Sequence, residues 1–275
     1  MIQIKPSIIL VILLALGACV ACDDEPQPAK PIVVQSVTPL DYIAEENLLL
    51  EGDPAKSFFT YSEALTAVPQ GTHLGSRYEW AGIIPLVTNL EEPTLIFQQA
   101  SEHLAVEEAI QIGDIKATYS SDYKNMGNGI SYALRLAPAK AAAEEGFPPA
   151  QDKKLLAAYR YQVSEGKEGG LLTVTVRHLG ESFDGTIEEV AKESFWAQNK
   201  QDDVERHFPF AGAVDDGDLV YVGTDGFYWT STPDGDTSAY YVWIGMGAAG
   251  IFDDGKLVDN YRQMGHSVRP FADHL

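Results

Sequence analysis

The spacing of apolar residues predicts short helices in the first part of the chain. In residues 59–68, FTYSEALTAV, apolar residues recur at helical spacing, and Ser62 is the expected N-cap. Further on, Ser76 and Glu79 have the spacing of a capping box, in which each residue bonds the backbone of the other. Pro85 should end or bend this second helix, because proline lacks the N–H that a helix interior needs.

A strand pattern replaces the helical one further along the chain. Residues 155–163 and 171–179 alternate in hydrophobicity and are rich in β-branched and aromatic side chains, and the Gly-rich segment between them predicts a hairpin. From Arg206 onward, short apolar runs are separated by Gly and Asp-Gly. Residues 101–112 have helix-like spacing, and residues 186–197 predict a short amphipathic helix. The chain is therefore predicted to be α+β, with helices first and strands last.

The run GMGAAG at residues 245–250 matches a dinucleotide-binding fingerprint by its letters. Such a fingerprint must follow a strand and open a helix within a βαβ unit. AYYVWI before it reads as a strand, but IFDDGKLVDN after it does not read as a helix. The glycines are therefore interpreted as a turn between paired strands and a place of close backbone approach, and no nucleotide is expected.

The composition is that of a folded, acidic protein. The chain has 275 residues, 45% of them hydrophobic, which is enough for a sizeable core. Its 40 acidic residues outnumber 19 basic ones and give a net charge of −21. Such a chain has no excess of cations with which to neutralise phosphates, so nucleic acid is excluded as a partner.

The N-terminus is predicted to be a bacterial lipoprotein leader. Residues 1–18 contain one lysine, an apolar run and small residues at the end, as a signal peptide does. LGAC, ending at Cys19, resembles a lipobox, which makes Cys19 the expected lipidation site and Cys22 the weaker alternative. Residues 19–36 read as a Pro-rich tether, whose acidic start resembles a surface-export signal of Bacteroidota lipoproteins, and residues 37–275 as one domain. These are the only two cysteines, so no disulfide is expected.

Motifs for catalysis or metal binding are weak. The six histidines form no metal-ligand pair, and there is no GxSxG motif. The Asp-Gly sites could supply ligands to Ca²⁺, but Asp-Gly is also the ordinary chemistry of tight turns, and no metal or cofactor is predicted. A carboxylate pair for glycoside hydrolysis stays open among 40 acids, although no two of them stand out.

Two segments carry a resemblance to a known family. They are VPQGTHLGSRYEWAGIIP, residues 68–85, and the segment from Arg206 to Phe271, which includes FYWTST, AYYVWIG and GHSVRPF. Both are similar to the Fibrobacter succinogenes major paralogous domain family. The matching residues are Pro69, Gly71, Leu74, Ser76, Glu79, Trp80, Phe208, Pro209, Ala211, Gly212, Gly223, Gly226, Tyr228, Trp229, Ser231, Thr232, Ala239, Tyr240, Tyr241, Gly265, Ser267, Val268, Arg269 and Pro270.

The resemblance implies a C-type-lectin-like fold, in which two helices pack on small antiparallel sheets and the N- and C-terminal strands pair. Val68 stands where many members have Cys, so that disulfide is not expected. The calcium-binding triplets of animal lectins and the cysteines of formylglycine-generating enzymes are missing, so neither function is carried over. Arg269 is expected to make an ion pair or bind backbone carbonyls under the sheet.

Two classes of function follow from these observations. The first is a non-catalytic binding module for a glycan or a protein, displayed as an outer-membrane lipoprotein at the cell surface, as an adhesin or a fimbrial accessory. The alternative is an enzyme acting on carbohydrate or peptidoglycan. The ligand is expected at three polar loops, residues 120–129, 232–238 and 255–263, because carboxylates, amides and tyrosines suit hydroxyl-rich ligands. The predicted ligand-binding residues are Tyr123, Asn125, Asp234, Asp236, Asn260 and Tyr261.

Overall fold

The computed structural model describes residues 37–50, 57–87, 93–166, 169–252 and 261–273. All of them belong to one unit of the chain, Gln35–Leu275. The predicted leader and tether, with Cys19 and Cys22, lie outside the described residues. Within the described part of the chain, no helix is both long enough and apolar enough to cross a membrane.

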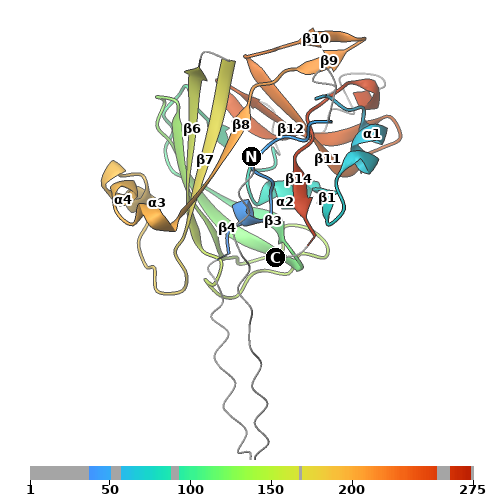
Figure 1. The fold of residues 1–275 in the computed structure, drawn as a ribbon. Helices are drawn as coiled ribbons and strands as arrows, with labels where there is room; N and C mark the ends of the chain where they lie inside the picture. The colour runs from blue at the N-terminus through green and yellow to red at the C-terminus, as the bar shows by residue number, and fades with distance from the viewer. Residues whose placement is uncertain (1–36, 51–56, 88–92, 167–168, 253–260, 274–275) are drawn as a thin grey trace, which may run out of the picture. The chain divides into compact units, whose positions relative to one another are not determined.

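An antiparallel sheet of six strands dominates the fold (Figure 1). Its strands pair in chain order and are β3 (Leu104–Ile112), β4 (Ile115–Asn125), β5 (Ile130–Pro138), β6 (Ala157–Gly166), β7 (Gly169–His178) and β8 (Asp203–Pro209). On β7, Leu172, Val174 and Val176 are fully buried, because alternate residues of a strand share a face. The hairpin predicted from residues 155–163 and 171–179 is confirmed as β6 and β7.

A second antiparallel sheet has four strands in the order β11-β12-β13-β2. They are β11 (Asp225–Asp234), β12 (Ser238–Gly245), β13 (Ala248–Phe252) and β2 (Leu95–Ile96). Met246 and Gly247 link β12 to β13, so the interpretation of GMGAAG as a turn is confirmed. A Cβ on Gly250 would lie 2.1 Å from a side-chain carbon of Val87, which shows the predicted close approach.

Two short pairs of strands complete the sheets. The strand β1 (Thr72–Leu74) pairs with β14 (Pro270–Ala272), and β9 (Ala213–Asp215) pairs with β10 (Asp218–Val220). The first pair brings His73 opposite Phe271. The C-terminal strand therefore pairs with a strand from the first third of the chain, as predicted.

The helices are few and short. Within the described residues, the α-helices are α1 (Tyr61–Ala67), α2 (Arg77–Ala81), α3 (Ile187–Val190) and α4 (Glu193–Ala197), and the 3-10 helices are η1 (Pro39–Asp41), η3 (Lys200–Asp202) and η4 (Tyr261–Gln263). The capping box of α2 is confirmed: the Glu79 carboxylate accepts from Ser76 N at 2.7 Å, and the Ser76 hydroxyl accepts from Glu79 N at 3.3 Å. The helix α1 begins after Thr60, so the prediction that Ser62 is its N-cap was wrong.

Side chains cover both faces of the six-stranded sheet. On one face, Trp80 of α2 and residues of the four-stranded sheet such as Val242 and Ile244 join the central apolar cluster. On the other face, Tyr132 packs with Trp196 of α4 in a smaller cluster. Figure 1 shows α3 and α4 on one side of the six-stranded sheet and α2 on the other. The predicted helix at residues 186–197 is therefore two short helices that close one face of the sheet.

Two buried arginines connect the elements. Arg135 is fully buried, pairs with Glu108 at 3.0 Å, and donates to backbone carbonyls at the C-terminal end of α2. Arg269 is also fully buried, and it donates to the carbonyls of Ala44 at 3.1 Å and His207 at 2.7 Å. Charged hydrogen bonds of this kind satisfy carbonyls that would otherwise be buried without a donor. The structural role predicted for Arg269 is confirmed.

The structure corrects the predicted order of elements. It is a mixed fold with few helices and mostly antiparallel sheets, and the residues that the structure describes contain no disulfide. Residues 101–112, expected to be helical, contain strand β3, which pairs with β4 along its whole length. The long strands therefore begin at Leu104, earlier than the predicted hairpin at residues 155–179.

Candidate functional site

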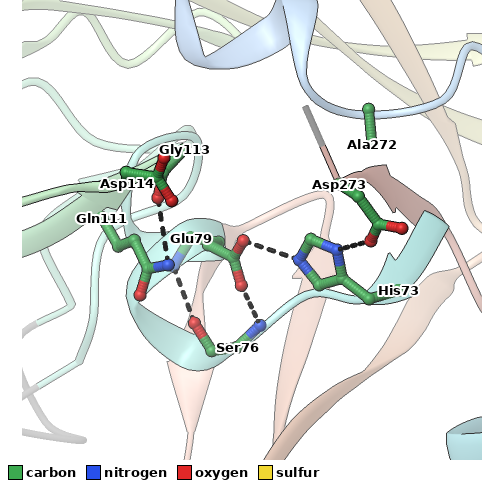
Figure 2. A pocket seen from close by; sticks show the side chains of 8 residues that line it. All are labelled: His73, Ser76, Glu79, Gln111, Gly113, Asp114, Ala272 and Asp273. Atoms are coloured by element: carbon green, nitrogen blue, oxygen red, sulfur yellow. Dashed lines mark hydrogen bonds and ion pairs between the residues drawn. The ribbon is translucent and has the colours of Figure 1, made fainter. Parts of the chain in front are cut away.

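A polar pocket of about 460 Å³ opens where β1, α2 and β14 meet the turn between β3 and β4 (Figure 2). This volume lies in the range of pockets that bind small molecules. Its lining residues are His73, Ser76, Glu79, Gln111, Gly113, Asp114, Ala272 and Asp273. Most of them are polar, and they come from three separate parts of the chain, residues 73–79, 111–114 and 272–273.

Strand pairing and helix capping position the pocket. His73 is the central residue of β1, and Asp273 follows the last residue of β14, so the pairing of these two strands brings the two side chains together. Glu79 is fixed by its capping role at the start of α2. Gly113 has a positive φ of 53° in the turn after β3, which places Asp114 at the rim of the pocket.

The His73 ring lies between two carboxylates, as Figure 2 shows. Its Nε2 is 2.7 Å from a Glu79 oxygen, and its Nδ1 is 2.9 Å from an Asp273 oxygen. Burial lowers the pKa of His73, but the hydrogen bonds and charges of Glu79 and Asp273 outweigh it, so the pKa is raised above its ordinary value. Near neutral pH this favours an imidazolium that donates to both carboxylates.

This arrangement does not suit nucleophilic catalysis. A serine nucleophile needs a histidine nitrogen that accepts its proton, but both nitrogens of His73 are held by carboxylates. The Ser76 hydroxyl accepts from the backbone of Glu79 and caps α2. The ring of His73 also fills the space between Glu79 and Asp273, where a hydrolase with two acids would place its sugar and water.

The pocket keeps polar groups for a ligand. Among the described residues, the Asp114 carboxylate has neither a hydrogen bond nor an ion pair. Gln111 uses its amide nitrogen to donate to the Gly113 carbonyl at 3.1 Å, and its amide oxygen has no partner in the described part of the chain. With a protonated His73, three carboxylates still leave the pocket negative. Such a surface can accept hydrogen bonds from hydroxyl or amino groups.

The prediction that residues 120–129 form a ligand-binding loop is wrong. Most of it belongs to strand β4, and Tyr123 and Asn125 are buried. The Tyr123 hydroxyl donates to both oxygens of Glu108 at 3.0 Å, and the Asn125 amide donates to a nearby backbone carbonyl and to the hydroxyl of Ser101. These two side chains hold the core together and do not face a ligand.

The other predicted residues separate into buried and exposed groups. Tyr261 is 4% exposed and packs against Trp229, so it also belongs to the core. Asn260 lies outside the described residues. Asp234 is partly exposed and Asp236 is exposed, at the turn between β11 and β12.

Two of the three predicted loops do meet. The segment at η4 contacts the turn between β11 and β12, because Arg262 donates to the carbonyls of Gly235 and Ser238, both at 2.8 Å. The single exposed patch predicted from three loops is not formed, however, since its tyrosines and Asn125 are buried. Among the predicted residues that the structure describes, Asp234 and Asp236 remain accessible.

Sequence reasoning missed the residues of the pocket itself. Histidines were judged by metal-ligand spacing, and His73 and Asp273 lie 200 positions apart. The expected pairing of the N- and C-terminal strands was the one available signal, because it predicts that residues flanking these strands come together.

Comparison with known proteins places the chain in a family. The sequence profile of a domain of unknown function, DUF8237, matches residues 35–271. The chain therefore belongs to the DUF8237 family, and the match includes the lining residues of the polar pocket from His73 to Asp114 but ends before Ala272 and Asp273. No curated protein and no solved structure matches the chain.

Proposed function

We propose that this protein is a lipid-anchored, non-catalytic binding module of the outer-membrane surface, with a C-type-lectin-like fold, and that it binds a glycan in the polar pocket around His73. The observation that carries the proposal is this open pocket, in which oxygens of Asp114 and Gln111 have no partner among the described residues and lie beside the half-exposed His73 and Asp273.

The lectin-like part of the proposal is supported by the roles of the residues that resemble the paralogous domain family. Trp80, Tyr228, Trp229 and Arg269 are all fully buried. The strands β1 and β14, which carry the two ends of the resemblance, are paired. Residues shared with such a family are thus used as framework, which leaves turns and strand ends free to bind ligands.

The glycan part of the proposal is supported by the chemistry of the pocket. Its walls offer carboxylate and amide oxygens, which accept hydrogen bonds from sugar hydroxyls. Its negative charge also favours sugars that carry an amino group. A binding role is preferred to hydrolysis, because the His73 ring lies between Glu79 and Asp273 and keeps a sugar from entering there.

The anchoring part of the proposal rests on LGAC at residues 16–19. Cys19→Ser should leave unprocessed precursor and remove the protein from the membrane fraction, because the diacylated cysteine is the proposed anchor. Cys22→Ser is the matched control and should leave the protein in the membrane fraction. Release by Cys22→Ser but not by Cys19→Ser would contradict the assignment of Cys19.

A glycan array tests the binding role. The purified protein should retain a limited set of glycans, and these should be recovered at their original length after long incubation. Shortened or cleaved glycans would favour the carbohydrate-active enzyme. Failure to retain any glycan, with the protein folded, would contradict the proposed ligand.

A further inference from the structure

Apolar side chains are exposed together at the hairpin of β9 and β10. Leu219 is 54% exposed, Tyr221 59% and Val222 54%. These three residues lie within positions 219–222, at the end of β10 and just after it, and Val220 between them is partly buried. Isolated exposed apolar residues are ordinary, but a contiguous group of them on a monomer marks an interaction surface.

The base of this hairpin is fixed by backbone hydrogen bonds. Val214 and Gly265 exchange two bonds of 2.8 Å, which join β9 to the segment before β14. The tight turn uses Asp216 and Gly217, both with positive φ, which suits a two-residue hairpin. Leu219 is therefore presented by a rigid hairpin, and Tyr221 and Val222 belong to the turn that directly follows it.

Tyr221 has an unusual backbone conformation. Its φ of 58° lies in the left-handed region, which a bulky residue seldom adopts. Its carbonyl accepts from Thr224 N and Asp225 N at 3.1 Å and from the Thr224 hydroxyl at 3.0 Å, and these three bonds hold the conformation in place. Glycine or asparagine would fit this turn with less strain. Its ring contacts Phe227, with 5.9 Å between the centroids, but most of the residue is in solvent. A strained, exposed tyrosine of this kind is typical of a binding residue.

Carboxylates surround the exposed apolar residues. Asp215, Asp216 and Asp218 are exposed, and within the described part of the chain none of their carboxylates has a hydrogen bond or an ion pair. The apolar group thus lies next to three uncompensated negative charges. A partner that covers it must bring apolar atoms for the centre and positive charges for the rim.

We propose that residues 215–222 form a docking surface for a second protein, one that offers an apolar pocket bordered by Lys or Arg. Tyr221 would fill the pocket, and Asp215, Asp216 and Asp218 would pair with the basic rim. This surface is separate from the polar pocket and does not depend on glycan binding. Two copies of this chain would repel each other here because both rims are acidic, and an anionic membrane would be repelled in the same way.

A displayed library of random dodecapeptides is the probe, selected on the full chain held in phosphatidylcholine nanodiscs. The selected peptides should combine Lys or Arg with large apolar residues. Their affinity should fall about tenfold or more in Tyr221→Asn, as at a hot spot. The affinity should fall similarly when Asp215, Asp216 and Asp218 are all changed to Asn. Because salt screens these charges, the loss of affinity in this triple variant should be smaller at high salt. Leu65→Ser, at a 46% exposed residue of α1, is the matched control and should change nothing.

The melting temperature separates docking from a structural role. Tyr221→Asn should melt no lower than the natural chain, because asparagine tolerates the left-handed conformation, and it should bind glycans as the natural chain does. A lower melting temperature would assign Tyr221 to the core and overturn the proposal. So would the absence of selected peptides, peptides that bind Tyr221→Asn unchanged, or sedimentation with phosphatidylcholine vesicles that depends on Tyr221.

Discussion

His266 allows a sharp test of how the core is built. It is fully buried, and neither ring nitrogen has a hydrogen-bond partner among the described residues. Its ring stacks on Trp229 with 4.1 Å between the centroids and is surrounded by Phe227, Tyr241 and Tyr261. Burial in this apolar cage lowers the pKa of His266 to about 3, because the charged form loses its water.

The size of the change in unfolding free energy with pH follows from proton linkage. Since the pKa of His266 is lower in the folded protein than in the unfolded chain, the unfolded chain binds more protons, and stability falls as the pH falls below about 6.5. The loss approaches about 1.4 kcal/mol per pH unit, or roughly 2–3 kcal/mol between pH 7.5 and pH 4.5. His266→Phe removes this titration. The variant should therefore lose about 2–3 kcal/mol less free energy of unfolding over the same pH interval.

Urea unfolding at the two pH values measures this difference. Tryptophan fluorescence is a suitable signal because Trp229 contacts His266 directly. Any change in packing caused by the larger phenylalanine is the same at both pH values and cancels in the comparison, and His266→Leu provides a smaller apolar control. If the natural chain and both variants lose equal free energy between pH 7.5 and pH 4.5, the reasoning about His266 is refuted.

Three further predictions concern the contacts that join distant segments. His73→Gln should lower the melting temperature more at pH 5.5 than at pH 9.5. The pKa of His73 is raised in the folded protein, so the stabilisation it gives is complete below about pH 6.5 and is lost as the pH rises through that raised pKa. An equal drop in melting temperature at both pH values would contradict this prediction. Arg135→Met should cost about 3–5 kcal/mol in urea unfolding, since it leaves Glu108 buried without its cation, and Glu108→Leu in the same chain should restore part of the loss. Deletion of residues 265–275 should abolish the cooperative melting transition by removing β14, and an unchanged transition would count against the closing role of this strand.

The features predicted correctly from the sequence are those determined by local chemistry. The capping box needs only Ser76 and Glu79, three positions apart, and the structure contains it. The hairpin of β6 and β7 and the turn within GMGAAG also depend on neighbouring residues alone. In each case the neighbouring residues were enough to choose an interpretation; for GMGAAG, the lack of a helical pattern after the glycines decided against a dinucleotide-binding fingerprint.

Strand β3 shows where the sequence was ambiguous. Its residues LAVEEAIQI fit a helix by their spacing, yet Val106, Ile110 and Ile112 also lie at alternating positions. Pairing with β4 over the whole strand and packing against α2 decide between the two. These partners are tertiary, so local propensity could not reveal them.

The candidate site was harder still to predict. Loops were chosen for their Asp, Asn and Tyr content, but Tyr123, Asn125 and Tyr261 use those polar groups or rings inside the core. Composition cannot tell a buried hydrogen-bonded tyrosine from an exposed one. The polar pocket instead depends on His73 and Asp273 meeting through strand pairing, which only the fold provides.

Titration calorimetry with the glycan retained most strongly by the array tests the central claim directly. Asp114→Asn should weaken binding about tenfold or more, because a charged acceptor of sugar hydroxyls becomes a neutral amide. Asp184→Asn changes an exposed aspartate outside the pocket and should leave the affinity unaltered. Equal affinities of the natural chain and Asp114→Asn would show that the glycan binds elsewhere and would contradict the assignment of the polar pocket.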